Sequence, residues 1–204
     1  MTIKGILVTL IAPMSDHIAN GGEKILGNAS SIKQRPDGRV YISGQKQRHA
    51  LFCALERLNL EDDTHGETYV SNGDGVTTLI EKDIRADLGG YLATNKNAYS
   101  GRRTAPLTAT PAVALVPSDI SRDLLIRLKV NANDSDSKSQ AVATREYSQH
   151  DDMCMSFHID VGAVGIRRKC AYDKELHIKT EFVKHLTEVE RRRRIKMALE
   201  ATAK

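Results

Sequence analysis

Short apolar runs and turn-forming clusters alternate along the first part of the chain. Residues 2–12 are largely apolar, which predicts a buried first strand. Residues 13–39 then contain prolines, glycines, and Asn-Gly and Asp-Gly pairs at a density that no helix or central strand tolerates. We therefore expect a long loop here, and loops of this length in compact domains are usually functional or disordered.

Two stretches show apolar positions at helical spacing. The first follows a short predicted strand at residues 39–42, begins after Ser43 as its N-cap and reaches about Leu58. The second covers residues 77–88 and is followed by a Gly-Gly pair, which is a typical helix stop. Each helix is expected to bury one apolar face.

The second half of the chain reads mainly as strands. Residues 104–116 are rich in Thr and Val but contain prolines, which predicts an irregular or edge strand. Residues 124–130 and 141–147 predict a hairpin, and residues 155–161 predict a further strand. The final segment, residues 181–203, is expected to be helical.

This order of elements predicts an α+β fold, a ferredoxin-like βαββαβ domain with an inserted hairpin. Its last strand is missing from the pattern. Either the polypeptide is truncated or another segment supplies that edge, because an uncovered central strand would leave backbone groups unpaired.

Length and composition bound the class of protein. A chain of 204 residues corresponds to one domain with extensions, or at most two small ones. The hydrophobic share of 40% is enough for a packed core and excludes collagen-like and wholly disordered classes. The net charge of +4 permits a polyanionic partner without requiring one.

The location follows from two further features of the composition. The longest apolar run is far shorter than the ~20 residues that cross a bilayer, so no membrane association is expected. The three cysteines form no CxxC motif and cannot all pair. A reducing, cytoplasmic location is the simpler interpretation.

The most informative chemistry lies at the start of the first predicted helix. Ser43, Gln45, Lys46 and Arg48 surround free backbone N–H groups and the positive end of the helix dipole. Cations at this end are unfavourable unless an anion lies among them, which indicates a phosphate site. The alternative is a basic first turn that only contacts solvent.

Three other polar segments allow a structural and a functional interpretation. Arg102 and Arg103, followed by Thr104, are suited to clamping a phosphate, but such pairs are also common on ordinary surfaces. The polar run at residues 131–140 is either a tip that orders against a partner or a solvated hairpin end. The four arginines at residues 191–194 are either a solvated helix segment or a wall that attracts polyanions.

Patterns typical of enzymes are weak. Asp83 and Asp87 lie one helical turn apart, but the neighbouring Lys82 and Arg85 favour structural charge balance over acid–base catalysis. The glycines and the seven histidines match no nucleotide-binding or metal-ligand motif, so no cofactor and no metal site is expected. Asp16, in the loop after the first strand, is either a ligand for a divalent ion near RNA or a plain loop residue.

Four segments together resemble a known family. They are residues 3–20, residues 40–55 with the S-G-Q-x-x-R helix start, residues 83–92 with D-x-G-G, and residues 102–107 with R-R-T-x-P. In this order, over most of residues 1–165, they resemble the backbone subunit of type I CRISPR surveillance complexes (Cascade), the DevR-like branch of the Cas-seven family.

The resemblance implies a single RNA-binding domain over residues 1–204. Its fold would be a modified RNA-recognition (ferredoxin-like) palm with a long loop at residues 13–39, a finger region at about 60–104 and a thumb hairpin at about 124–150. Family members continue past the last helix with a Gly-rich basic loop and a closing strand. Copies of such a subunit stack along a guide RNA into a helical filament.

The resemblance also implies which residues meet RNA. Asn20 and Lys24 in the first loop would face the guide backbone together with the helix-start residues. Arg102 and Arg103 would lie near the nucleic acid, and a thumb around Lys138 and Gln140 would reach a neighbouring copy.

The function implied is a non-catalytic backbone subunit. Its partners would be the CRISPR guide RNA (crRNA), the target DNA strand paired to it, other copies of itself and other Cascade subunits. Two alternatives remain open. One is a metal-dependent, RNA-cleaving backbone subunit of the type III kind that uses Asp16, and the other is a stand-alone RNA chaperone that binds as isolated monomers.

Overall fold

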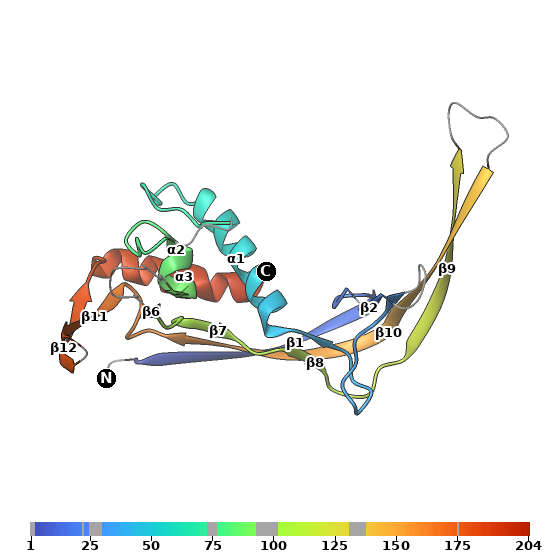
Figure 1. Ribbon diagram of the computed structural model, residues 1–204, viewed down its shortest axis with the longest axis horizontal. Coiled ribbons are helices and arrows are strands. Elements are labelled where there is room, and N and C mark those ends of the chain that lie inside the picture. Colours follow the sequence, from blue (N-terminus) through green and yellow to red (C-terminus); the bar gives the residue numbers. More distant parts are fainter. Residues whose placement is uncertain are drawn as a thin grey trace. The chain divides into compact units, whose positions relative to one another are not determined.

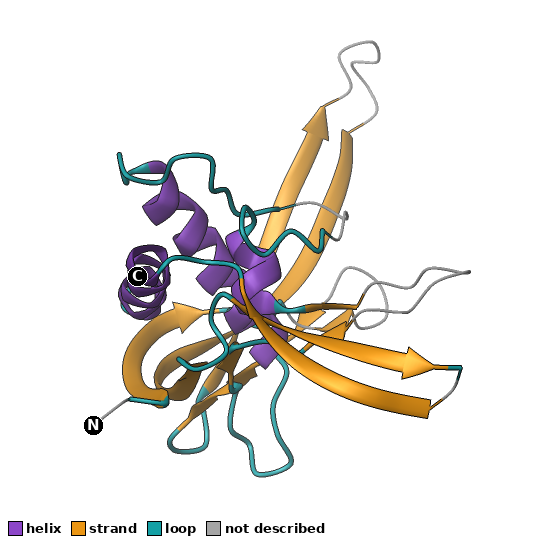
Figure 2. Ribbon diagram, turned by 90° about the vertical axis from the view of Figure 1, so that its left-hand side faces the viewer, coloured by secondary structure: helices purple, strands orange, loops and turns teal. Residues whose placement is uncertain are grey.

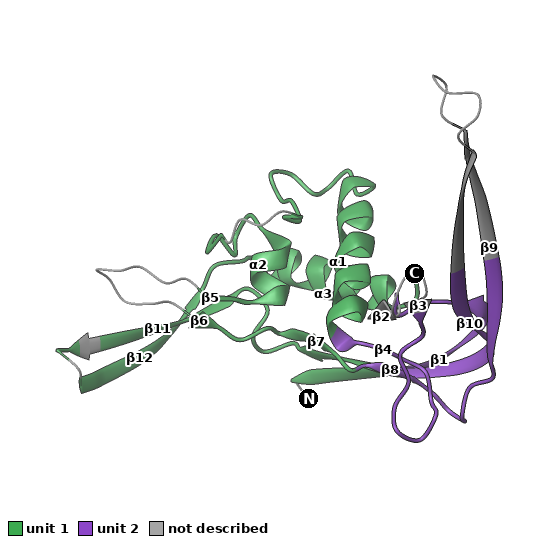
Figure 3. Cartoon of the chain, turned by 45° about the vertical axis from the view of Figure 1, so that its right-hand side comes forward, with its two compact units in different colours: residues 1–8, 45–110, 156–204 green, residues 9–44, 111–155 purple. Residues whose placement is uncertain are grey.

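A computed structural model describes residues 3–21, 23–24, 30–72, 77–92, 102–130, 138–174 and 176–204. Helices and strands are mixed, and strand pairing is mainly antiparallel, so the expected α+β class is confirmed (Figures 1 and 2). The chain divides into two compact units, residues 1–8, 45–110 and 156–204, and residues 9–44 and 111–155 (Figure 3). Below they are called unit 1 and unit 2.

Unit 1 contains the helices and two small hairpins. Its elements are α1 (Gly44–Leu60, whose first residue closes unit 2), α2 (Ile84–Gly89), β5 (Tyr91–Leu92), β6 (Arg102–Arg103), β7 (Leu107–Ala109), β11 (Ile166–Asp173), β12 (Leu176–Lys184) and α3 (Glu188–Thr202).

Unit 2 consists of strands. They are β2 (Glu23–Lys24), β3 (Ser30–Ser31), β4 (Tyr41–Ile42), β8 (Ala112–Ala114) and β9 (Ile120–Val130), together with parts of β1 (Gly5–His17) and β10 (Lys138–Asp160), which both units share.

Strand β10 organises the main sheet. It pairs with β1, β3, β7, β8 and β9. The predicted strands at 141–147 and 155–161 are therefore one strand of 23 residues, which is a correction. Its first half forms a continuous antiparallel ladder with β9, so the predicted hairpin is confirmed and begins earlier than expected.

The segment at residues 104–116 forms two strands instead of one. Pro111 separates β7 from β8, because proline has no N–H for the ladder. Strand β8 pairs with β10 on one side and with β4 on the other. The expected edge position is thus wrong for β8, which lies inside the sheet.

The first predicted elements agree well with the structure. Strand β1 and helix α1 are confirmed as elements, although β1 continues to His17 and α1 to Leu60. The expected burial of the first strand is wrong, because β1 alternates between exposed and half-buried positions, and Leu7 and Ile11 are among the exposed ones. The predicted loop at residues 13–39 therefore begins later than expected and includes the two-residue strands β2 and β3.

Two helices begin later than predicted. The second starts at Ile84 because Asp83 caps it, its side chain accepting a hydrogen bond from the backbone N–H of Arg85. At the C-terminal side, residues 166–173 and 176–184 pair as the β11–β12 hairpin, and Thr187 caps α3. The expected helix at residues 181–187 is wrong, since this stretch continues a run with β-branched and aromatic residues that favours a strand.

Each unit has its own small core. In unit 1, α1 buries Leu51, Phe52 and Leu55, and Ile80, Ala86 and Tyr91 form a further cluster. In unit 2, Ile42, Ala112, Ala114 and Met153 pack together. Among the described residues, no helix is both long and apolar enough to span a bilayer.

Candidate nucleic-acid interface

The start of α1 is open to solvent. Ser43, Gln45 and Lys46 are exposed, and the first turn holds no acidic residue. The first backbone N–H groups of a helix lack intrahelical partners and lie at the positive end of its dipole. These three predicted residues thus remain accessible to an anionic partner.

Arg48, one turn further, is directed towards the end of α2. Its guanidinium donates a hydrogen bond to the carbonyl oxygen of Gly89 and lies 5.6 Å from the centre of the Phe52 ring. Burial, and then the positive charge of Arg85, lower the pKa of Arg48. Arg48 therefore stabilises the C-terminal end of α2, where a cation is favourable, and its predicted contact with RNA stays a prediction.

The predicted pair Arg102–Arg103 divides into one exposed and one buried side chain. Arg102 is exposed. Arg103 contacts the carboxylate of Asp87 and donates to the carbonyl oxygens of Asp87 and Ala163, each at 2.9 Å. Burial lowers the pKa of Arg103, and the charge of Asp87 opposes this shift.

Asp87 is the centre of a buried ionic network. Its second carboxylate oxygen accepts a hydrogen bond at 2.9 Å from Arg194, and both side chains are fully buried. The backbone N–H of Gly165 donates to the first oxygen at 2.9 Å. Asp87 thus joins α2, β6 and α3, so its role is structural, as expected, but its partners are Arg103 and Arg194 and not Lys82 or Arg85.

Three of the four arginines at residues 191–194 are also structural. Arg191 donates to the carbonyl oxygens of Val161 and Val164, and Arg193 binds Asp62 at 3.0 Å. Only the side chain of Arg192 is largely exposed, at 80%. The interpretation as a solvated segment is therefore wrong for Arg191, Arg193 and Arg194, because α3 packs through them.

The residues of unit 2 that are predicted to contact RNA differ in how much of them the structure describes. Asn20 is half-buried and holds the loop through hydrogen bonds with the backbone of Lys33 and the carbonyl oxygen of Tyr41. Only the backbone of Lys24, Lys138 and Gln140 is described, and the last two lie in β10 opposite β9. The predicted RNA contacts of these three residues depend on their side chains, which lie outside the described part of the structure.

Asp16 lies within strand β1, next to its last residue, and not in the loop after it as expected; it adopts a left-handed conformation, with φ of 47°, and is exposed. Aspartate tolerates this conformation better than most residues. In the part of the chain that the structure describes, no three His, Cys, Asp or Glu side chains are arranged to hold a metal ion.

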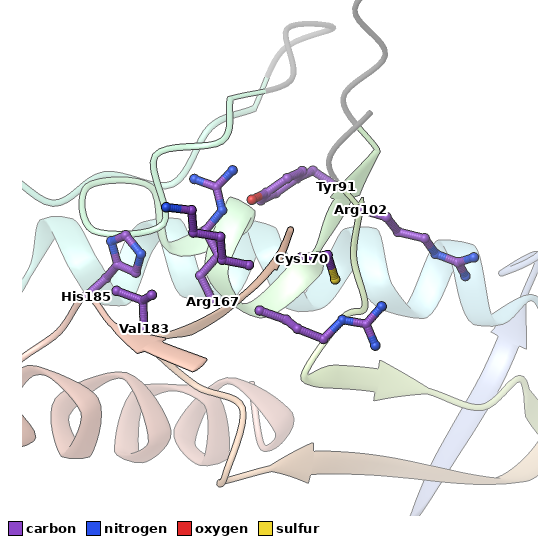
Figure 4. Close-up of a pocket in the computed structure, with 8 residues that line it drawn as sticks. Tyr91, Arg102, Arg167, Cys170, Val183 and His185 are labelled. Carbon is purple, nitrogen blue, oxygen red and sulfur yellow. The ribbon is translucent and has the colours of Figure 1, made fainter. Parts of the chain in front are cut away.

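A basic pocket adjoins Arg102. Its volume is about 460 Å³, and it is lined by Tyr91 and Arg102 from β5 and β6, by the β11–β12 hairpin and by His185 (Figure 4). The hairpin contributes Arg167, Arg168 and Lys169. Sequence reasoning missed these cations, although the Arg-Arg-Lys run is visible, because residues 166–184 were not recognised as a hairpin.

Comparison with solved structures shows which known chains share this fold. The chain matches a chain described as "CRISPR RNA-guided surveillance complex", with a TM-score of 0.54 and 11% identity, over 97% of this chain and 60% of that one. A second match, "CRISPR RNA-guided surveillance complex, pre-nicking", has a TM-score of 0.52 and 10% identity, over 97% and 67%. These matches show a shared fold, and the chain spans about two thirds of the length of those chains or less.

A match to a family model then shows to which protein family the chain belongs. The model "CRISPR-associated negative auto-regulator DevR/Csa2" matches residues 27–204. The chain belongs to this family, which confirms the resemblance noted in the sequence. A search of the curated proteins finds no match.

Proposed function

We propose that this protein is a non-catalytic backbone subunit that binds guide RNA in a type I Cascade-like effector. The observation that carries the proposal is the DevR/Csa2 family match over residues 27–204. The fold shared with chains of RNA-guided surveillance complexes supports it.

The exposed basic side chains among the described residues are suited to binding an RNA backbone. Affinity would come from neutralised phosphates, and backbone contacts carry no sequence information. Sequence choice would be left to pairing between the guide and the target DNA strand. The start of α1, with Ser43, Gln45 and Lys46, is the primary site for the guide backbone.

The finer architecture belongs to the same proposal. The main sheet and the helices of unit 1 would form the RNA-recognition palm, and the β9–β10 hairpin would be the thumb that reaches a neighbouring copy. Copies would stack along the guide and associate with other Cascade subunits.

RNA recovery after native purification tests the helix-start site. Lys46→Glu should reduce the copurified RNA and flatten the salt dependence, since each neutralised single-strand phosphate contributes a log–log slope of about −0.7. Lys196→Glu is a matched control, because Lys196 is exposed on α3 and forms a salt bridge of 3.6 Å with Glu200 on the same helix. Arg48 is unsuitable for this test, since it also holds Gly89.

Equal RNA yields from both variants would disprove the helix-start site.

The non-catalytic part of the proposal is tested with Asp16→Ala and a guide-paired RNA target in the presence of divalent ions. We expect intact RNA from the parent protein and the variant alike. Regularly spaced cleavage that disappears in Asp16→Ala would instead establish the type III alternative.

A further inference from the structure

Three arginines line the surface between β5–β6 and the β11–β12 hairpin. The basic pocket adjoins a second cavity of about 600 Å³, and Arg102, Arg167 and Arg168 line both. Arg102 and Arg168 are exposed, and Arg167 is half-buried. All of these residues belong to unit 1.

The charges of this surface are not balanced by the described residues around it. The first cavity is lined by no carboxylate, and the second only by that of Asp160. Among the described residues, none of the salt bridges involves Arg102, Arg167 or Arg168, whereas Arg103 beside them is neutralised by Asp87. Like charges gathered in this way repel one another unless an anion lies among them, and guanidinium groups present planar donors that fit a phosphate.

An exposed aromatic ring lies next to these cations. Phe182 lines the second cavity, is 72% exposed and stands directly opposite Arg168 in the β11–β12 ladder. Residues opposite each other in an antiparallel pair share one face of the hairpin. Cationic side chains beside an accessible aromatic ring are the usual arrangement for binding single-stranded nucleic acid, since any base can stack on the ring.

We propose that this surface, which we call the hairpin site, binds single-stranded RNA, with phosphates held by Arg102 and Arg168 and a base stacked on Phe182. The proposal rests on the proposed function and adds a contact region to it, separate in sequence from the start of α1. The excess of positive charge favours RNA over a protein partner as the occupant.

Binding of fluorescein-labelled oligouridine to the full, nuclease-treated chain tests the hairpin site by fluorescence anisotropy at several salt concentrations. Phe182→Ala should weaken binding roughly 10-fold without changing the salt slope, because it removes stacking but no charge. Phe182→Tyr keeps a ring and should bind like the parent. The double variant Arg102→Gln, Arg168→Gln should make the slope shallower by about 1.4, since two phosphate contacts are lost.

Arg192→Gln is the matched control, because Arg192 is exposed on α3 and lines neither cavity. Melting temperatures close to that of the parent would show that the variants fold. Unchanged affinity in Phe182→Ala, or an unchanged slope in the double variant, would overturn the hairpin site. A change in solution mass of Phe182→Ala with unaltered RNA affinity would identify the hairpin as a protein contact instead.

These outcomes separate the inference from the proposed function. If the hairpin variants bind normally while Lys46→Glu loses RNA, the subunit binds RNA and the hairpin site is wrong. If the parent chain shows no salt-dependent binding of RNA, the proposed function fails and the hairpin site fails with it.

Discussion

At the scale of single residues, Asp87 has the greatest structural role in unit 1. It accepts hydrogen bonds from Arg103, Arg194 and the N–H of Gly165, and it is fully buried. A buried carboxylate is tolerated only when it is paired and hydrogen-bonded in this way. Arg103 in turn depends on Asp87 for charge compensation, whereas Arg194 also pairs with Glu190 at 2.7 Å.

Asp87→Asn should therefore lower the free energy of unfolding by about 3–5 kcal/mol, because it leaves two buried arginines without their common counter-charge. Urea denaturation measures this change. Glu67→Gln is the control, since Glu67 is exposed and its salt bridge is with the exposed Lys82, and surface pairs contribute little. Similar midpoints for both variants would show that the network is not important for stability.

A second residue-scale prediction concerns acid stability. Hydrogen bonds from the hydroxyl and backbone N–H of Thr64, and then from Arg193, lower the pKa of Asp62 from 3.8 to about 2. Because the pKa is depressed in the folded protein, the carboxylate stabilises the fold above about pH 4, and this contribution is lost as the pH falls towards 2.

Asp62→Asn should accordingly show a flatter decline of melting temperature between about pH 4 and pH 2 than the parent protein. Asp63→Asn is the matched control, since the neighbouring Asp63 is exposed and makes none of these hydrogen bonds. If the two variants decline equally steeply, Asp62 does not govern acid stability.

At the scale of elements, the end of α2 is packed more tightly than the sequence indicates. Gly90 has φ of 68°, and an added Cβ would lie 2.4 Å from the carbonyl oxygen of Arg103. The preceding Gly89 lies against Arg48 and Phe52. The Gly-Gly pair therefore ends the helix and also admits β6 beside it.

Gly90→Ala should destabilise the protein clearly more than Gly66→Ala. Both glycines have positive φ, where alanine costs about 1–2 kcal/mol, but an added Cβ at Gly66 meets nothing within 4 Å. Displacing the Arg103 backbone adds about 1–3 kcal/mol. Thermal melts of the two variants measure the difference, and equal losses would show that close packing at Gly90 has no effect.

The elements also show where sequence patterns are reliable. The continuous apolar run of β1 and the buried stripe of α1 are local signals, and both elements form, but β1 alternates between exposed and half-buried positions and is not the buried strand expected. The β11–β12 hairpin was missed because polar and basic residues occupy both strands, and every residue of β12 is exposed. Without a buried face, a strand has no clear alternation of polar and apolar positions.

At the scale of the whole molecule, the proposed function predicts an assembly held together by RNA. Natively purified protein should form particles much heavier than the 22.5 kDa chain, and nuclease treatment should reduce their mass. Mass photometry before and after treatment measures this change. A stand-alone RNA chaperone would instead remain near the mass of one chain in both samples.

The sequence by itself determined the family, the α+β class and the basic start of α1, since these depend on local motifs and periodicity. Only the tertiary structure decided which arginines are accessible. Arg102 and Arg103 are adjacent and chemically identical, yet one is exposed and the other is bound to Asp87. The physical reason is that burial of a charge depends on partners distant in sequence, such as Asp87 for Arg194, and no local pattern encodes them.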